Sequence, residues 1–141
     1  MVRKHHVLFL CTGNCCRSQM AEAILVHLGA DRFVAHSAGS DPAGFVHWLA
    51  EDALERLGIP LHKNAWSKSW DDFEHQPMEL VITVCDAAAG VCPAWLKGGL
   101  VVHWPLPDPS FVEGNDEDRL EAAVRVAERL RLKIQRLVAL V

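Results

Sequence analysis

The chain has 141 residues, of which 50% are hydrophobic and 23% charged, and its formal net charge is −4. This length predicts a single domain, residues 1–141, large enough for a full hydrophobic core. The negative charge argues against a general nucleic-acid-binding protein, which needs a basic surface, and the composition is not acidic enough to predict disorder.

The five cysteines raise the alternative of a secreted, disulfide-stapled module. The apolar run near the N-terminus is too short for the core of a signal peptide, and no run approaches the length of a membrane span. We therefore expect a cytoplasmic protein with no membrane partner. In that compartment thiols stay reduced and serve catalysis, redox chemistry or metal binding.

Four short runs predict strands. They are Val7–Leu10, Phe33–Ser37, Leu80–Val84 and Leu100–His103. Val7–Leu10 is uniformly apolar and is therefore expected to be buried on both faces, as strands of parallel sheets are, and Leu80–Val84 gives the second strong signal of a buried strand.

Helical spacing of apolar residues predicts helices between and after these strands. They are Ser18–Leu28, ended by Gly29, Val46–Leu57, ended by Gly58 and Pro60, a short helix near Ser69–His75, and Asp116–Val138. Alternating strands and helices predict an α/β fold, a three-layer doubly wound sheet of four parallel strands with helices on both faces. Because reactive groups gather beyond the carboxyl ends of parallel strands, we expect Cys11, Cys85 and Asp108 at one edge of the sheet.

Cys11 and Arg17 delimit a candidate anion-binding loop. A Gly13-Asn14 turn follows the strand, and a helix-forming segment follows Arg17. The backbone N–H groups of such a loop and the positive end of a helix dipole favour an anion. The Arg17 guanidinium adds a planar fork of donors for a tetrahedral oxyanion. The same field, with the Ser18 hydroxyl, should favour the thiolate form of Cys11 and make it a nucleophile; the alternative is a buried structural cysteine.

Cys85 and Cys92 form a second candidate site. Their separation equals about 10 Å in a helix, whereas the Cα atoms of a disulfide lie within about 7 Å. A bridge between them requires this segment to bend or unwind, which Gly90 and Pro93 make plausible. The alternatives are two unconnected cysteines or half a metal site, but the absence of a C-x-x-C pair weakens a zinc site.

Asp108 lies between Pro107 and Pro109. An Asp-Pro pair is a common turn signal, so a structural turn is one interpretation. The other is a general acid held rigidly over the anion loop.

The stretch from Cys11 to Glu22, Cys-Thr-Gly-Asn-Cys-Cys-Arg-Ser-Gln-Met-Ala-Glu, resembles the phosphate loop of low-molecular-weight tyrosine phosphatases. It resembles more closely that of the thioredoxin-coupled arsenate reductases built on the same fold. The residues after Ser18 favour the reductases, because proline commonly follows this serine in the phosphatases. Cys85, Cys92 and Asp108 match in order, so the resemblance covers nearly the whole chain.

The resemblance implies a three-cysteine reduction of arsenate to arsenite. Cys11 attacks arsenate, with Arg17 binding the oxyanion and Asp108 protonating the leaving oxygen. Cys85 then attacks Cys11 and forms a disulfide with it, which releases arsenite. Cys92 attacks Cys85 next and gives a Cys85–Cys92 disulfide that is exposed to an external thiol donor. The implied donor is thioredoxin, with glutaredoxin or mycothiol as alternatives. No organic cofactor or redox metal is needed, and phosphate and sulfate are competing oxyanions.

The resemblance also assigns the remaining loop residues. Thr12, Gly13, Asn14, Cys15, Cys16, Arg17 and Ser18 form the substrate-binding loop, in which we expect structural roles for Cys15 and Cys16. Asn14, Ser18, Glu22 and Ser37 support this loop, in some members around a potassium ion. Lys68 falls where those members place a carboxylate. Its ammonium could replace the cation, which argues against a potassium site here.

Two other functions compete with arsenate reduction. A tyrosine phosphatase would use Cys11, Arg17 and Asp108 and leave the other cysteines idle, although such enzymes usually carry aromatic residues beside the general acid. Here Ser110 and Phe111 follow Pro109. A non-catalytic thiol module that senses oxidants or binds arsenite would need the cysteines but not Asp108.

Overall fold

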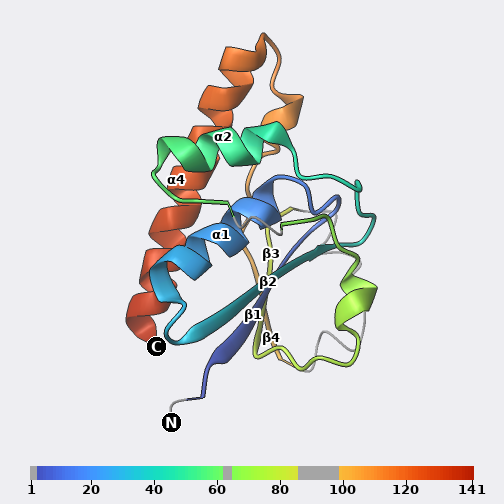
Figure 1. Ribbon diagram of the computed structural model, residues 1–141, viewed down its shortest axis with the longest axis vertical. Helices are drawn as coiled ribbons and strands as arrows, with labels where there is room; N and C mark the ends of the chain where they lie inside the picture. Colours follow the sequence, from blue (N-terminus) through green and yellow to red (C-terminus); the bar gives the residue numbers. More distant parts are fainter. Residues whose placement is uncertain (1–2, 62–64, 86–98) are drawn as a thin grey trace.

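The computed structural model describes residues 3–61, 65–85 and 99–141, and its centre is a four-stranded sheet (Figure 1). All three strand pairings are parallel, and the strand order is β2-β1-β3-β4. The prediction of four parallel strands is therefore confirmed. The strands are β1 His5–Cys11, β2 Phe33–Gly39, β3 Leu80–Thr83 and β4 Leu100–His103.

The helical segments cover both faces of this sheet. On one face, the Phe9 ring of β1 lies 6.2 Å from that of Trp104, over which α4 places Lys133. On the other face, Phe73 of η1 makes an edge contact with His36 of β2. The segments are α1 Arg17–Gly29, α2 Trp48–Arg56, η1 Trp70–Phe73, η3 Pro109–Phe111 and α4 Asp116–Leu140.

The core lies between the sheet and the helices α1, α2 and α4, which lie together in Figure 1. None of the described helices is long and apolar enough to cross a membrane. The largest fully buried apolar side chains come from all three of these helices and from β1 and β3: Leu8, Phe9, Leu10, Met20, Ile24, Leu25, Leu49, Leu54, Ile82, Leu130 and Ile134.

Gly29 corrects one sequence expectation. We expected it to stop the helix after Leu28, but it is the last residue of α1 and has no left-handed conformation. A Cβ at this position would lie 3.0 Å from the Phe33 ring and 3.1 Å from the Val138 side chain. Gly29 therefore allows α1 to approach β2 and α4 closely, which is a tertiary requirement.

Other element boundaries shift by a few residues. The helix predicted from Val46 begins at Trp48, because the His47 ring accepts a hydrogen bond from the backbone of Leu49 and caps it. The second strand runs on to Gly39, and the last helix continues to Leu140.

Candidate active site

Residues 11–17 form a loop between β1 and α1 whose carbonyl groups point outward. The carbonyl oxygens of Thr12, Gly13 and Cys15 accept hydrogen bonds of 2.9, 2.9 and 2.7 Å from backbone N–H groups in residues 41–47. The Ser67 hydroxyl donates a second bond to Gly13 at 2.9 Å. Because the two groups of a peptide point in opposite directions, the N–H groups of these peptides face the inside of the loop. Sequence reasoning did not foresee this outer support.

The N-terminus of α1 opens into the same loop. Cys16 is its N-cap residue, no side chain caps it, and its first turn carries no acidic residue. The uncapped N–H groups and the helix dipole thus remain available to an anion.

Cys11 ends β1 and is almost completely buried, with 3% of its surface exposed. Its Sγ lies 2.9 Å from the Ser18 hydroxyl and accepts a hydrogen bond of 3.2 Å from the Asn14 backbone N–H. The hydrogen bond expected from Ser18 is present. The sulfur is thus held by one contact from the loop and one from the first turn of α1.

Cys15 and Cys16 differ from Cys11 in their surroundings. Burial raises the pKa of both thiols, and the neighbouring thiols and Asp108 raise them further, against a smaller lowering by Arg17. A thiol that stays protonated is a poor nucleophile. The surroundings of these two cysteines therefore favour the structural roles predicted for them.

Arg17 and Asp108 lie together at the open side of the loop. The guanidinium donates to the Leu106 carbonyl at 2.9 Å and contacts Asp108 Oδ2 at 3.4 Å. The other carboxylate oxygen, Oδ1, accepts bonds of 2.9 and 2.7 Å from the backbone and hydroxyl of Ser110. Ser110 thus fixes the carboxyl group and leaves Oδ2 directed toward Arg17, a role that the sequence did not reveal.

Cys85 lies beside the loop, as the strand-end prediction requires. It is buried, and its Sγ lies 3.5 Å from the hydroxyl of Thr12, the residue after Cys11. Thr12 was predicted as an oxyanion-binding residue, and no local signal pointed to this contact with Cys85. Cys92 lies outside the described residues.

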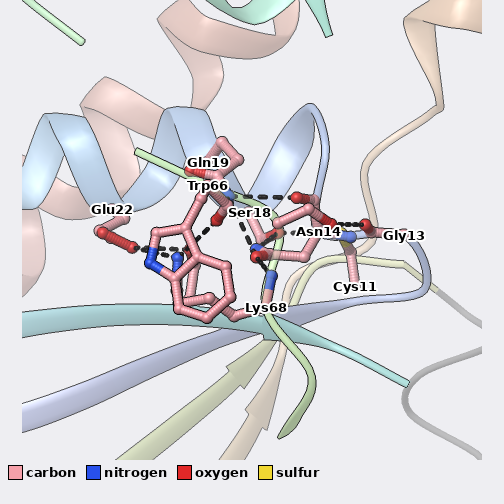
Figure 2. A network of polar contacts seen from close by, with 10 residues as sticks. Cys11, Gly13, Asn14, Ser18, Gln19, Glu22, Trp66 and Lys68 are labelled. Atoms are coloured by element: carbon pink, nitrogen blue, oxygen red, sulfur yellow. Dashed lines mark hydrogen bonds and ion pairs between the residues drawn. The ribbon is translucent and has the colours of Figure 1, made fainter. Parts of the chain in front are cut away.

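A polar network supports the loop from behind (Figure 2). Asn14 has a positive φ of 46° and is fully buried, and its side chain donates to Ser18 Oγ at 2.8 Å. Its side-chain oxygen Oδ1 accepts a hydrogen bond from the Gln19 side chain at 3.0 Å and from the Lys68 backbone N–H at 2.8 Å.

Two further predicted support residues, Glu22 and Ser37, share a hydrogen bond of 2.6 Å. The Lys68 ammonium lies 3.7 Å from the same Glu22 carboxylate. The structure thus brings together all the predicted support residues. Lys68 is bonded to Asn14 directly through its backbone, and Gln19, which was not predicted, adds a second link to Asn14 through the Trp66 carbonyl.

Gly39 is a site residue that the sequence did not reveal. A Cβ there would lie 2.4 Å from the Thr12 carbonyl oxygen and 2.9 Å from the Asn14 nitrogen. Replacing Gly39 with alanine is therefore expected to push the loop outward. We expect a loss of about 2 kcal/mol in the free energy of unfolding and about tenfold weaker binding of inorganic phosphate, measured by urea denaturation and titration calorimetry.

Gly58→Ala is the matched control for this prediction. A Cβ at Gly58 would meet nothing within 4 Å, although its φ of 71° disfavours alanine. This variant should lose about 1 kcal/mol of stability and bind phosphate normally. Equal phosphate affinities for Gly39→Ala and the wild type would contradict the close approach of β2 to the loop.

The sequence model of the low molecular weight phosphotyrosine protein phosphatase family matches residues 6–139. The chain belongs to this family. Within it, an arsenate reductase from Halalkalibacterium halodurans is 37% identical over 134 residues, which cover 95% of each chain.

Solved structures of arsenate reductases superpose on nearly the whole chain. One, described as an arsenate reductase in the phosphate binding state, has a TM-score of 0.78 at 28% identity and covers 96% of this chain and 97% of its own. A thioredoxin-dependent arsenate reductase from Corynebacterium glutamicum has a TM-score of 0.68 at 29% identity, covering 94% of this chain and 63% of that one. This member of the phosphatase family is thus similar to arsenate reductases along nearly its whole length.

Proposed function

We propose that this protein is an arsenate reductase that uses its cysteines as the source of electrons. The observation that carries the proposal is the second buried thiol, Cys85, in contact with the oxyanion loop through Thr12 at 3.5 Å. A phosphatase needs only the loop cysteine, its arginine and a general acid. Reduction needs a second thiol within reach of the first. The arsenate reductases among the relatives support the same choice.

The first step is attack on arsenate by Cys11. The loop N–H groups and Arg17 hold the oxyanion, and the Cys11 sulfur forms a bond to arsenic while one oxygen leaves as water. Asp108 is the general acid that protonates this oxygen. The position of the carboxyl group supports this assignment, because Oδ2 lies 3.4 Å from the guanidinium that holds the oxyanion and Ser110 fixes the other oxygen.

The second step transfers two electrons to arsenic. The Cys85 thiolate attacks the sulfur of Cys11, the sulfur–arsenic bond breaks, and its electron pair stays on arsenic, which leaves as arsenite. The two thiols become a disulfide. Cys92 then attacks Cys85, frees Cys11, and presents a Cys85–Cys92 disulfide to an external thiol donor.

The external thiol donor that we propose is thioredoxin, since one structural neighbour is a thioredoxin-dependent arsenate reductase. Glutaredoxin and mycothiol are the alternatives. Phosphate should compete with arsenate for the loop because both are tetrahedral oxyanions, and another neighbour is an arsenate reductase in a phosphate-binding state.

The test is a coupled assay with arsenate, thioredoxin, thioredoxin reductase and NADPH. We expect one NADPH to be oxidised for each arsenite formed, and no oxidation with Cys11→Ser or without thioredoxin. Asp108→Ala should slow arsenate turnover by about 10²-fold. A non-catalytic thiol module would keep its response to oxidants or arsenite in this variant, because it does not need the carboxylate. A protein that hydrolyses an aryl phosphate but forms no arsenite with thioredoxin, glutaredoxin or mycothiol as the thiol donor would be a phosphatase instead.

A further inference from the structure

The Lys68 ammonium lies inside the polar network behind the catalytic loop, and not in solvent. Only 12% of its side chain is exposed, and the Glu22 side chain beside it is 20% exposed. Lysine is almost never buried unless it is paired. Solubility alone therefore does not account for a lysine at this position.

Three contacts of this ammonium with described residues favour a cation. The Trp66 carbonyl oxygen accepts a hydrogen bond from it at 2.9 Å, and the Glu22 carboxylate lies at 3.7 Å. The Trp66 ring lies over it at 5.5 Å from the ring centroid, a distance at which the ring face attracts a cation. Ser37 donates a hydrogen bond of 2.6 Å to Oε1 of the same carboxylate, the oxygen that also faces the ammonium.

The residues that contact the Lys68 ammonium are linked to the nucleophile through Gln19 and Asn14. Gln19 donates to the Trp66 carbonyl at 2.9 Å and to the Asn14 side-chain oxygen at 3.0 Å (Figure 2). It therefore connects the carbonyl group that binds the ammonium to the catalytic loop. The backbone N–H of Lys68 donates to the same Asn14 oxygen at 2.8 Å. Asn14 in turn donates its backbone N–H to the sulfur of Cys11.

We propose that the Lys68 ammonium is the resident cation of this loop, so that the loop takes no potassium ion. The support residues do not fit a second monovalent cation, because the ammonium already binds the Glu22 carboxylate and the Trp66 carbonyl. A potassium ion at the same acceptors would face a full positive charge at close range. Lys68 acts through Asn14 and is thus a positioning residue.

The proposal deepens the arsenate reductase function, but its main readout is the binding of inorganic phosphate. If arsenate is not the substrate, phosphate binding still tests Lys68. Conversely, a protein that reduces arsenate only with potassium would refute the proposal and leave the proposed function intact.

The first experiment uses the wild-type protein in chloride salts of potassium, sodium and N-methyl-D-glucamine at equal ionic strength. The dissociation constant of phosphate and kcat/KM for arsenate should agree within about twofold in the three salts. Potassium activation of about fivefold or more over N-methyl-D-glucamine would overturn the proposal. This arm needs no variant, so it does not depend on whether a variant folds.

The second experiment compares Lys68→Met with Lys133→Met. Both ammonium groups lie over a tryptophan ring, at 5.5 and 5.6 Å, but Lys133 lies on α4 over Trp104. In the N-methyl-D-glucamine salt, Lys68→Met should bind phosphate about tenfold more weakly and should recover in potassium chloride. Lys133→Met should match the wild type in every salt. Wild-type binding by Lys68→Met, or a loss that potassium does not restore, would overturn the proposal.

Discussion

Replacing Cys85 with serine is expected to abolish arsenate turnover and to leave hydrolysis of an aryl phosphate within about threefold of wild type. Hydrolysis needs the Cys11 thiolate, the loop N–H groups and Arg17, none of which is changed. Reduction also needs a thiol that attacks the sulfur of Cys11, and a serine hydroxyl cannot form a disulfide. The two activities are measured by NADPH oxidation and by p-nitrophenol release.

Cys92→Ser refines the same prediction by stopping the relay one step later. After one equivalent of arsenate without reductant, this variant should lose two hydrogen atoms in its intact mass and hold a Cys11–Cys85 disulfide. Cys15→Ser is the control, because burial raises the pKa of that thiol and we expect it to take no part in the relay. Full turnover by Cys85→Ser, or equal loss of both activities, would contradict the relay.

The parts of the site that depend on neighbouring residues could be predicted from the sequence. The strand before Cys11, the turn at Asn14 and the helix after Arg17 follow one another within a few residues, so local rules were enough. The hydrogen bond between Ser18 and Cys11 belongs to the same stretch.

The parts that depend on the packing of distant segments could not be predicted. Ser110 beside Asp108, and Gly39 beneath the Thr12 carbonyl, are common residue types with no local signature for these contacts. Gln19 was missed for the same reason. Its role depends on Trp66, which the fold brings beside α1.

The resemblance and the structure give different parts of the evidence for the role of Lys68. The resemblance placed it beside the loop-support residues and suggested that its charge replaces a cation. Only the fold shows the ammonium against Glu22 and the backbone of the same residue bonded to Asn14. The support network therefore converges on Asn14, the residue that contacts the nucleophile from behind.

Replacing Asn14 with alanine is therefore expected to affect both stability and chemistry strongly. Alanine removes the acceptor of the Lys68 backbone N–H, whereas Gln19 keeps the Trp66 carbonyl as a partner. An orphaned buried donor and a left-handed alanine together should lower the free energy of unfolding by about 3 kcal/mol. If φ moves away from 46°, the N–H bond to Cys11 is lost as well, and kcat/KM for arsenate should fall by about 10²-fold.

Two variants separate the causes of this loss. Asn14→Gly tolerates the left-handed backbone but still lacks the side-chain bonds, so it should recover about 1 kcal/mol of stability and part of the activity.

Asn115→Ala removes another asparagine whose side chain accepts a backbone bond, at the exposed start of α4. It should cost about 1 kcal/mol with no change in kcat/KM. Stability is measured by urea denaturation at a pH where the wild type is active. If Asn14→Ala loses no more stability than Asn115→Ala and keeps its activity, the loop does not depend on the network behind it.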